Sequence, residues 1–200
     1  MDIIFYNGLA DGYMNNPPTE YILLGTLMNG PRHGYEIMRI LESALKAAWR
    51  VSTSQLYSLM KRMEKEKLLE SSIEPQVTRP SKRVFRITKK GKDAFLAWLS
   101  NPTDHVRDFR LEFLGKLYFY DKLSLKGAME LIEAQIQGLY RIQQRLLKEK
   151  KQENDPFNVL VYDFKLETVR GHLRWLSRSA KNYIVKRNGH HERFLSGGER

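Results

Sequence analysis

Residues 51–67 decide the fold of this 200-residue chain, and they read Val-Ser-Thr-Ser-Gln-Leu-Tyr-Ser-Leu-Met-Lys-Arg-Met-Glu-Lys-Glu-Lys. Ser52 followed by Gln55 is a capping-box pattern, which predicts where a helix begins. The apolar residues of the stretch recur at the i, i+3, i+4, i+7 spacing of one helix face, namely Leu56, Leu59, Met60 and Met63. The opposite face carries small polar groups first and positive charge further along, namely Ser54, Ser58, Lys61 and Lys65.

Two interpretations fit this amphipathic helix. A helix that reads DNA with its N-terminal half in the major groove needs this layout. Small polar side chains there let the backbone approach base edges, while Lys and Arg meet phosphates. An ordinary surface helix with a solvated Lys/Glu face has the same pattern. The stretch alone therefore does not decide between the two.

The composition narrows the choice. The net charge is +11 and the isoelectric point is about 9.8, which favours an anionic partner such as nucleic acid. Residues 76–92 hold seven basic residues and no acidic one. The chain has no cysteine, which excludes disulfides, thiol nucleophiles and zinc–cysteine sites. We see no signal peptide and no apolar run of the roughly 18 residues that a membrane span needs, so we expect a cytoplasmic protein.

The first half of the chain predicts a winged helix-turn-helix domain over residues 19–100, preceded by an N-terminal arm over 1–18. Helices are expected from Thr19 to Met28, over 33–47 and over the stretch quoted above. Two short strands should follow around residues 68–73 and 84–87, joined by a polar, basic connection over 76–83. Three helices followed by a hairpin with a basic tip form the winged-helix arrangement, in which the wing grips DNA beside the groove.

The second half predicts an α-helical C-terminal domain over residues 107–187 and a flexible tail over 188–200. One heptad seam runs from Leu125 to Leu146, and Asp155-Pro156 opens a further helix. The seam of that helix supplies the residues expected to form a dimer, namely Tyr162, Leu166, Val169, Leu173, Leu176 and Tyr183. The two seams can equally pack on each other as a hairpin, and the sequence leaves both options open. The expected fold is mainly α with a small β-hairpin.

These pieces together resemble the PadR family of transcriptional regulators, in particular its longer-tailed subfamily with a helical C-terminal domain. The resemblance covers roughly residues 19–187 and rests on these segments: Ile22-Leu-Leu-Gly-Thr-Leu, Gly30-Pro-Arg-His-Gly-Tyr-Glu-Ile, Trp49-Arg-Val-Ser, Leu56-Tyr57, Lys61-Arg-Met-Glu, Arg83-Val-Phe-Arg-Ile-Thr, Lys90-Gly91 and Asp108-Phe-Arg-Leu-Glu-Phe-Leu-Gly-Lys. It implies a homodimeric DNA-binding regulator, usually a repressor, that a small molecule or cellular signal releases.

Two departures from the family pattern bear on this expectation. Many members have Ser-Pro-Gly where this chain has Ser52-Thr53-Ser54, and Pro where it has Ser58, so the operator preference is expected to be its own. Many also have Gly where Lys67 stands. Because Lys tolerates a left-handed backbone less well than Gly, the turn after the helix is expected to differ in detail.

The expected DNA-binding residues come from the helix, the wing and two tyrosines: Tyr35, Ser52, Thr53, Ser54, Gln55, Tyr57, Ser58, Lys61, Arg62, Arg79, Lys82 and Arg83. The resemblance places Tyr35 and Tyr57 near the DNA backbone, although both rings can equally fill the core. Gln55 can read adenine, or it can spend its amide on the capping box. Trp49 and Trp98 either line an effector pocket or pack in the core.

Other functional classes find less support in the sequence. We find no phosphate loop, metal-ligand spacing or Ser-His-Asp pattern, so neither catalysis nor a cofactor is expected. His190-His191 is interpreted as a solvated tail rather than a metal site. The expected partners are double-stranded DNA, a second copy of the chain and a small-molecule effector. Two rival hypotheses are a non-specific architectural DNA-binding protein and a helical adaptor that binds protein.

Overall fold

A computed structural model describes residues 18–44, 52–74 and 82–187 of the chain. The chain divides into two compact units, the first comprising residues 1–101 and 107–126 and the second 102–106 and 127–200. This division differs from the predicted domains, because residues 107–126 belong with the winged helix and not with the C-terminal helices. Phe119 from this segment packs on Gly25, and the backbone of Gly115 lies close to Ile22. Each unit is described by itself below.

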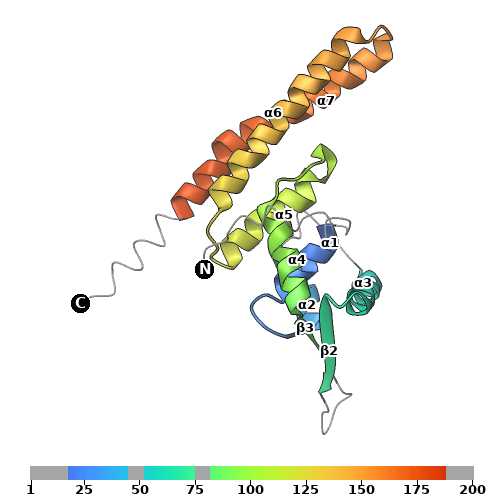
Figure 1. Cartoon of the computed structure of the whole chain (residues 1–200), viewed down its shortest axis with the longest axis vertical. Coiled ribbons are helices and arrows are strands. Elements are labelled where there is room, and N and C mark those ends of the chain that lie inside the picture. Colours follow the sequence, from blue (N-terminus) through green and yellow to red (C-terminus); the bar gives the residue numbers. More distant parts are fainter. Residues whose placement is uncertain (1–17, 45–51, 75–81, 188–200) are drawn as a thin grey trace, which may run out of the picture. The chain divides into compact units, whose positions relative to one another are not determined.

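The first unit contains five helices and three strands within its described residues (Figure 1). In chain order these elements are α1 (Pro18–Thr26), β1 (Arg32–His33), α2 (Gly34–Ala44), α3 (Thr53–Lys65), β2 (Leu69–Glu74), β3 (Lys82–Ile87), α4 (Lys89–Ser100) and α5 (Phe109–Lys122). A 3₁₀ turn, η2 (Val106–Asp108), precedes α5. The predicted order of three helices followed by a hairpin is confirmed.

The sheet has three antiparallel strands in the order β1-β3-β2. Phe85 is the central residue of the register, because it pairs with Ser71 of β2 on one side and with Arg32 of β1 on the other. The sequence reading missed β1. Two residues are too short to show the apolar alternation by which strands are recognised.

The core of the first unit lies between α1, α4 and α5 and extends under the sheet. Phe95 of α4 is fully buried and meets the ring of Phe119 edge-on, with ring centroids 5.3 Å apart. Phe119 lies so close to Gly25 of α1 that a Cβ atom on that glycine would collide with the ring. This contact explains why the Ile22-Leu-Leu-Gly-Thr-Leu segment carries a glycine inside a helix, where glycine is otherwise unfavourable.

Lys67 forms the turn between α3 and β2 in a left-handed backbone conformation, with φ of 59°. The amide of Leu68 donates back to the carbonyl of Met63 at 2.9 Å, and Thr88 Oγ1 donates to the carbonyl of Lys67 at 2.8 Å. The turn thus keeps the geometry that glycine favours, although a lysine occupies it.

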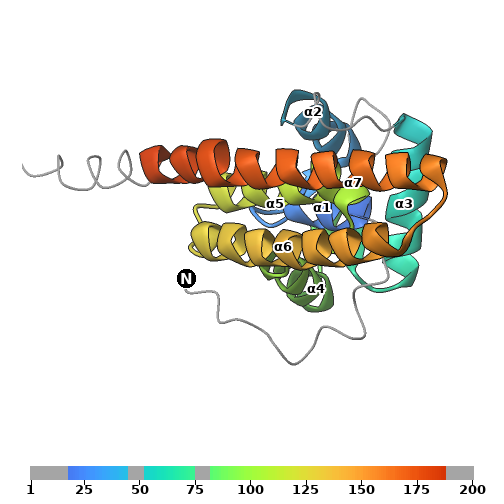
Figure 2. The ribbon, with the colours of Figure 1, turned by 90° about the horizontal axis from the view of Figure 1, so that it is seen from above.

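The second unit is a helical hairpin of α6 (Ala128–Gln152) and α7 (Pro156–Trp175), which lie side by side (Figures 1 and 2). Asp155 Oδ1 accepts from the amide of Asn158 at 2.9 Å, and this bond confirms the predicted helix start. A π-helical segment, η3 (Leu176–Ala180), follows α7, and residues 181–187 remain helical. No helix among the described residues is both long and apolar enough to cross a lipid bilayer.

Candidate nucleic-acid interface

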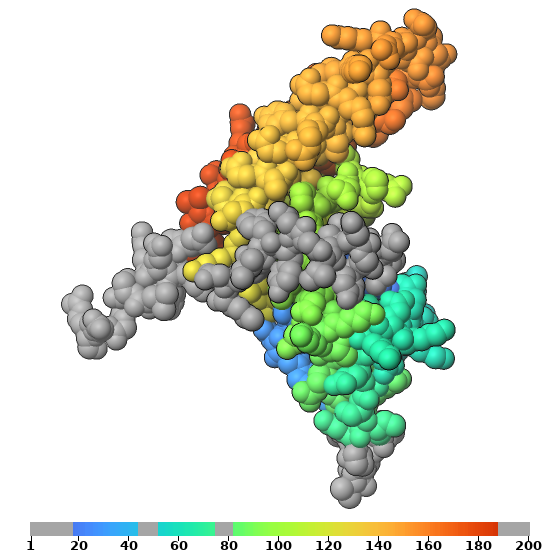
Figure 3. Space-filling view, viewed as in Figure 1, coloured from blue at the N-terminus to red at the C-terminus, as the bar shows by residue number. Residues whose placement is uncertain are grey.

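Helix α3 presents a polar, exposed surface over its N-terminal half and buries its apolar stripe. Three of the four residues of the predicted stripe, Leu56, Met60 and Met63, are almost inaccessible, whereas the fourth, Leu59, is only partly buried. The exposed residues of this helix and its cap are Ser52, Thr53, Ser54, Gln55, Tyr57, Ser58, Lys61, Arg62 and Lys65. In the space-filling view, α3 and β2 contribute a surface of the first unit (Figure 3, teal).

The predicted capping box is present at the start of α3. Ser52 Oγ accepts from the amide of Gln55 at 3.3 Å, and Gln55 Oε1 accepts from the amide of Ser52 at 3.0 Å. Ser52 Oγ is also 3.1 Å from Gln55 Oε1. The cap thus occupies the carbonyl oxygen of Gln55 and leaves its amide nitrogen without a partner among the described residues. A bidentate contact to adenine needs both atoms, so it would require the cap to open.

Tyr57 brings two separate segments of the family resemblance into contact, the Leu56-Tyr57 segment and the segment that contains Gly34. Its phenol lies so close to the backbone of Gly34 that a Cβ atom on that residue would meet the ring and its hydroxyl. The tyrosine is nevertheless 45% exposed. The His33-Gly34-Tyr35 and Leu56-Tyr57 blocks therefore occur together because the tyrosine of one packs on the glycine of the other.

Tyr35 is more exposed still, at 53%, and belongs to a small aromatic and cationic group at the base of the wing. Its ring stacks on His33 with centroids 5.5 Å apart and planes within 9°. Lys82 Nζ lies 5.4 Å from the centre of the same ring. Neither tyrosine fills the core, because each keeps about half of its surface exposed.

Two of the predicted DNA-contacting arginines already have acidic partners inside the fold. Arg62 of α3 pairs with Glu20 of α1, which is completely buried, and lies 4.0 Å from Glu66. These contacts fix the orientation of α3 relative to α1. An arginine held in this way supports the recognition surface, and less of its charge remains for a phosphate.

Arg83 is paired at the base of the wing. Its Nη2 lies 2.7 Å from Glu64 Oε2, and its Nε donates to Ser71 Oγ at 2.7 Å. These bonds tie β3 to α3 and β2. Lys61 differs from both arginines, because it is exposed and forms no ion pair with another described residue. Lys65 of the same helix is likewise exposed and forms no ion pair with another described residue, so both lysines keep their charge unpaired at the surface of α3.

Of the remaining predicted residues, two lie outside the part of the chain that the structure describes and one is buried. Arg79 and Trp49 lie outside the described residues. Trp98 is 3% exposed and stacks on Tyr21 of α1, with ring centroids 5.2 Å apart, and Lys116 Nζ lies 5.0 Å from its ring centre. Its indole N–H is buried without a hydrogen-bond partner among the described residues. Trp98 thus packs in the core of the first unit.

The sequence reading missed two acidic residues that organise this surface, Glu20 and Glu64, and Ser71, whose hydroxyl donates to Glu64. Glu20 looks like an ordinary acid in the first turn of a helix. No spacing rule connects it to Arg62, which lies 42 positions further along the chain. Within the described ranges, no group of three or more His, Asp or Glu side chains is arranged to hold a metal ion.

Comparisons with known proteins find a family and several relatives that this chain resembles. Residues 23–97 match the model of the transcriptional regulator PadR-like family. The chain is 29% identical over 118 residues to the negative transcriptional regulator PadR of Bacillus subtilis, and 24% identical over 90 residues to a probable transcriptional regulator of Mycobacterium tuberculosis. These alignments cover 59% and 45% of this chain, and they span 65% and 48% of the two relatives.

One solved structure can be set beside this chain. The crystal structure of Bacillus subtilis PadR in complex with operator DNA is 24% identical, with a TM-score of 0.44. The match covers 82% of this chain and 98% of that one.

Proposed function

This chain belongs to the PadR-like family of transcriptional regulators, and from that premise we propose that it is a DNA-binding regulator, most simply a homodimeric repressor of a palindromic operator. One observation carries the proposal: the capped N-terminal half of α3 exposes a run of hydroxyl and amide groups. Hydroxyl and amide groups are the donors and acceptors that base edges pair with. An exposed Lys on the same helix and the winged hairpin beside it add contacts to phosphates.

In this proposal, each subunit places residues 52–62 in one major groove. The wing contacts the adjoining backbone through Lys82 and Arg79, and Tyr35 and Tyr57 donate to phosphate oxygens. The two half-sites of the operator would then be separated by one helical turn, roughly 34–36 Å, or a multiple of it. Arg62 and Arg83 act mainly by holding α3 and the wing in place, since carboxylates already pair with both guanidinium groups. A DNA-binding role also implies a cytoplasmic location, which is part of the same proposal.

The homodimer is proposed to form through α7. Four of the residues expected at the dimer seam are already buried within a single chain, namely Leu166, Val169, Leu173 and Leu176. Tyr162 is half-buried and Tyr183 is half-exposed. A different stripe of α7 faces outward, because Phe157, Leu160 and Phe164 are 70%, 62% and 73% exposed. Large apolar side chains at helical spacing on a surface mark a protein interface, so we assign this stripe, together with Tyr183, to the second copy.

Release by a small molecule is the last element of the proposal. Trp98, the described half of the predicted effector pair with Trp49, packs in the core of the first unit, so the proposal does not place the effector against it. The effector switches DNA binding only if it favours one arrangement of the recognition helices over another.

The experiment that tests the proposal selects bound fragments from the genome of the source organism and compares them with random duplex at fixed salt. A palindromic site that is strongly preferred supports the regulator. Equal binding to both DNAs favours the architectural alternative, and the absence of any mobility shift in dilute buffer favours the protein-binding adaptor. Candidate small molecules are then tested for release of the selected fragment.

A further inference from the structure

Lysines gather where the end of α3, the turn into β2 and the start of α4 meet. Thr88 Oγ1 donates to the carbonyl of Lys67 at 2.8 Å, and Lys90 Nζ donates to the carbonyl of Glu66 at 2.9 Å. These bonds hold together two segments that are distant in the sequence. The exposed lysines at this junction are here called the lysine patch, and they are Lys67, Lys89 and Lys90.

The charge of the lysine patch is not neutralised within the fold. None of its three lysines forms an ion pair with another described residue, and neither do Lys65 and Lys92, which flank the patch in the sequence and are also exposed. The acid that lies between two of these lysines is Glu66, and its carboxylate is 4.0 Å from Arg62. The patch therefore presents uncompensated positive charge to its surroundings.

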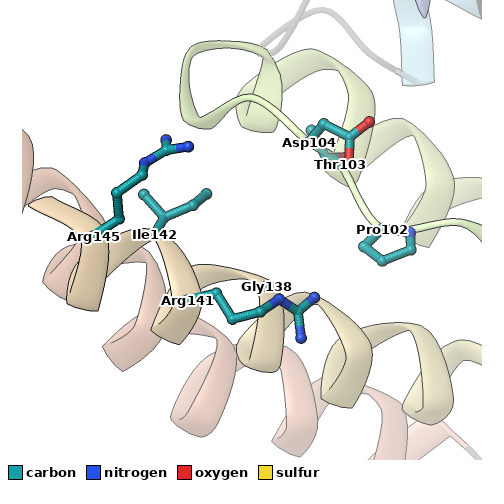
Figure 4. A pocket seen from close by; sticks show the side chains of 7 residues that line it. All are labelled: Pro102, Thr103, Asp104, Gly138, Arg141, Ile142 and Arg145. Atoms are coloured by element: carbon teal, nitrogen blue, oxygen red, sulfur yellow. The ribbon is translucent and has the colours of Figure 1, made fainter.

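Positive charge in the second unit is balanced more closely. Arg145 Nε of α6 lies 3.8 Å from Glu149. A cavity of about 350 Å³ separates this part of α6 from the segment that carries Asp104, and Figure 4 shows Asp104 across that cavity from Arg145. The uncompensated charge of the lysine patch is thus not a simple consequence of the net charge of the chain, which is +11.

Two lysines of the patch stand where the fold favours another residue. Lys67 has a φ of 59°, a conformation that glycine adopts more readily. Lys89 is the first residue of α4, where the helix dipole favours an acid, and the first turn of α4 contains none. Lys90 differs, because its bond to the carbonyl of Glu66 supports the end of α3. The charges of Lys67 and Lys89 therefore serve a partner rather than the fold.

The lysine patch lies at the far end of both elements that the proposed function places on the operator. Lys67 follows Gln55 by 12 residues, which is about 18 Å along a helix. Strand β2 leads away from the patch toward the wing tip over Leu69–Glu74, a length of about 17 Å (Figure 1). The patch is thus separate from the reading half of α3 and from the wing tip, and it faces a different partner.

The composition of this surface indicates the kind of partner. The cores of protein interfaces are depleted in lysine and enriched in aromatic residues, methionine and arginine. No large apolar side chain is exposed among residues 65–69 and 86–92. A nucleic-acid backbone, by contrast, is bound by positive charge alone, because neutralised phosphates release their counterions. The surface therefore fits a DNA backbone better than an acidic protein.

We propose that the lysine patch binds the phosphate backbone of a second DNA segment while α3 and the wing hold the operator. The chain then bridges two duplexes, or two distant parts of one duplex. This inference rests on the proposed function for the occupant of α3, but the residues that carry it are different ones.

The test is a bridging assay with the full chain. An operator fragment selected from the genome is immobilised and saturated with protein, and fluorescent random duplex is then added in dilute buffer. The wild type should capture the random duplex. The double variant Lys67→Gly/Lys89→Gln should capture at least about tenfold less, because two phosphate contacts are lost, and its affinity for the operator should not change.

Two comparisons exclude trivial causes of lost capture. Lys122→Gln/Lys148→Gln is the matched control, because it removes two charges from exposed positions on α5 and α6 that form no ion pair with another described residue. Its capture should equal that of the wild type. Thermal unfolding of Lys67→Gly/Lys89→Gln should occur at a temperature no lower than the wild type, since glycine favours the backbone conformation of residue 67.

The outcomes separate this inference from the proposed function. No capture by the wild type, capture that persists in Lys67→Gly/Lys89→Gln, or an equal loss in the control variant overturns the inference and leaves operator binding intact. Poly-glutamate that displaces the random duplex more effectively, per negative charge, than unlabelled duplex does also overturns it, in favour of an acidic protein.

A wild type without preference for the operator overturns the proposed function alone. Binding of random duplex in solution then tests the lysine patch by itself. The slope of log K against log salt should decrease by about two units in Lys67→Gly/Lys89→Gln and stay constant in the control variant. An unchanged slope in Lys67→Gly/Lys89→Gln overturns the inference.

Discussion

The two compact units differ in which side chains are paired or buried within the fold and which remain exposed. In the winged-helix unit, carboxylates within the same unit pair with two arginines of the predicted DNA surface, Arg62 and Arg83. In the helical hairpin, four of the six residues of the predicted dimer seam are buried against their own chain, while Phe157, Leu160 and Phe164 remain exposed. In the winged-helix unit, ion pairs within the fold thus neutralise two of the predicted contact charges, while polar groups of α3 remain exposed. In the helical hairpin, one apolar stripe of α7 is buried within the fold and a second one remains exposed.

This difference shows how to separate supporting residues from contact residues. A side chain that is satisfied within the fold acts first on stability, and its effect on a partner is indirect. A side chain that is exposed and unpaired acts on the partner and hardly on stability. Arg62 belongs to the first group and Lys61 to the second, although one residue follows the other in the sequence. The predictions below test this distinction, from the largest expected effect to the smallest.

Arg62→Ala should have the largest effect, because it leaves the carboxylate of Glu20 buried without its partner. Removing one member of a buried ion pair costs about 3–5 kcal/mol, and the partial exposure of Arg62 favours the lower end of that range. Denaturant unfolding of the variant should therefore show a loss of about 3 kcal/mol. The double variant Glu20→Gln/Arg62→Gln should recover most of it, because no charge is then left buried. A double variant as unstable as Arg62→Ala would contradict a supporting role.

Phe164→Glu should break the proposed dimer while leaving the hairpin folded. Burying a phenylalanine is worth about 1.5–3 kcal/mol, and a symmetric interface loses it twice, so the dimer dissociation constant should rise at least about 100-fold. Sedimentation equilibrium measures the change. Val185→Glu is a useful comparison, since Val185 is also exposed but lies outside the stripe on α7. Dimerisation that is unaffected by Phe164→Glu and lost in Val185→Glu would move the interface to the end of the helix.

Local patterns in the sequence predicted most of the fold but only part of the site. The capping box of Ser52 and Gln55, the buried stripe of α3 and the start of α7 at Asp155 each follow from neighbouring residues, so spacing alone identifies them. The pairing of Glu20 with Arg62 and the contact of Tyr57 with Gly34 join distant segments, and no local rule predicts them. Heptad spacing predicted that Leu166 and Val169 are buried, but it did not say which helix covers them.

The division into units illustrates the same limit. Asn101-Pro102 marks the end of α4, and a domain boundary there was a natural expectation. Helix α5 nevertheless packs on α1, because Gly25 and Gly115 allow close contacts that only the folded chain reveals. A glycine in a helix is visible in the sequence, but the side chain that requires it is not.

Lys61→Ala should weaken binding to all DNA sequences alike, because Lys61 is exposed and its expected contact is a phosphate. The slope of log K against log salt should decrease by about one unit, while the stability should change by less than about 0.5 kcal/mol. Lys148→Ala removes the same charge from an exposed position on α6 and should leave the salt slope unchanged if α3 carries the contact. Equal slopes for wild type and Lys61→Ala would remove Lys61 from the interface.

Lys67→Gly should have the smallest effect, a gain in stability of about 0.5–1 kcal/mol. Glycine adopts the observed φ of 59° without the steric penalty that a side chain pays, and part of that gain is lost to the greater freedom of the unfolded chain. Lys61→Gly, a change in the interior of α3, should instead cost about 1 kcal/mol. Thermal unfolding of the two variants compares them directly, and a destabilised Lys67→Gly would show that the turn is not strained.

The most direct test of the account is the ratio of two dissociation constants, measured at one salt concentration, for a genomic fragment selected by the protein and for random duplex of equal length. If α3 reads base edges, the selected fragment should bind at least about 10³-fold more tightly, as sequence-specific DNA-binding proteins do. A ratio near one would contradict the account, because the exposed polar half of α3 would then contribute nothing that random DNA does not also provide.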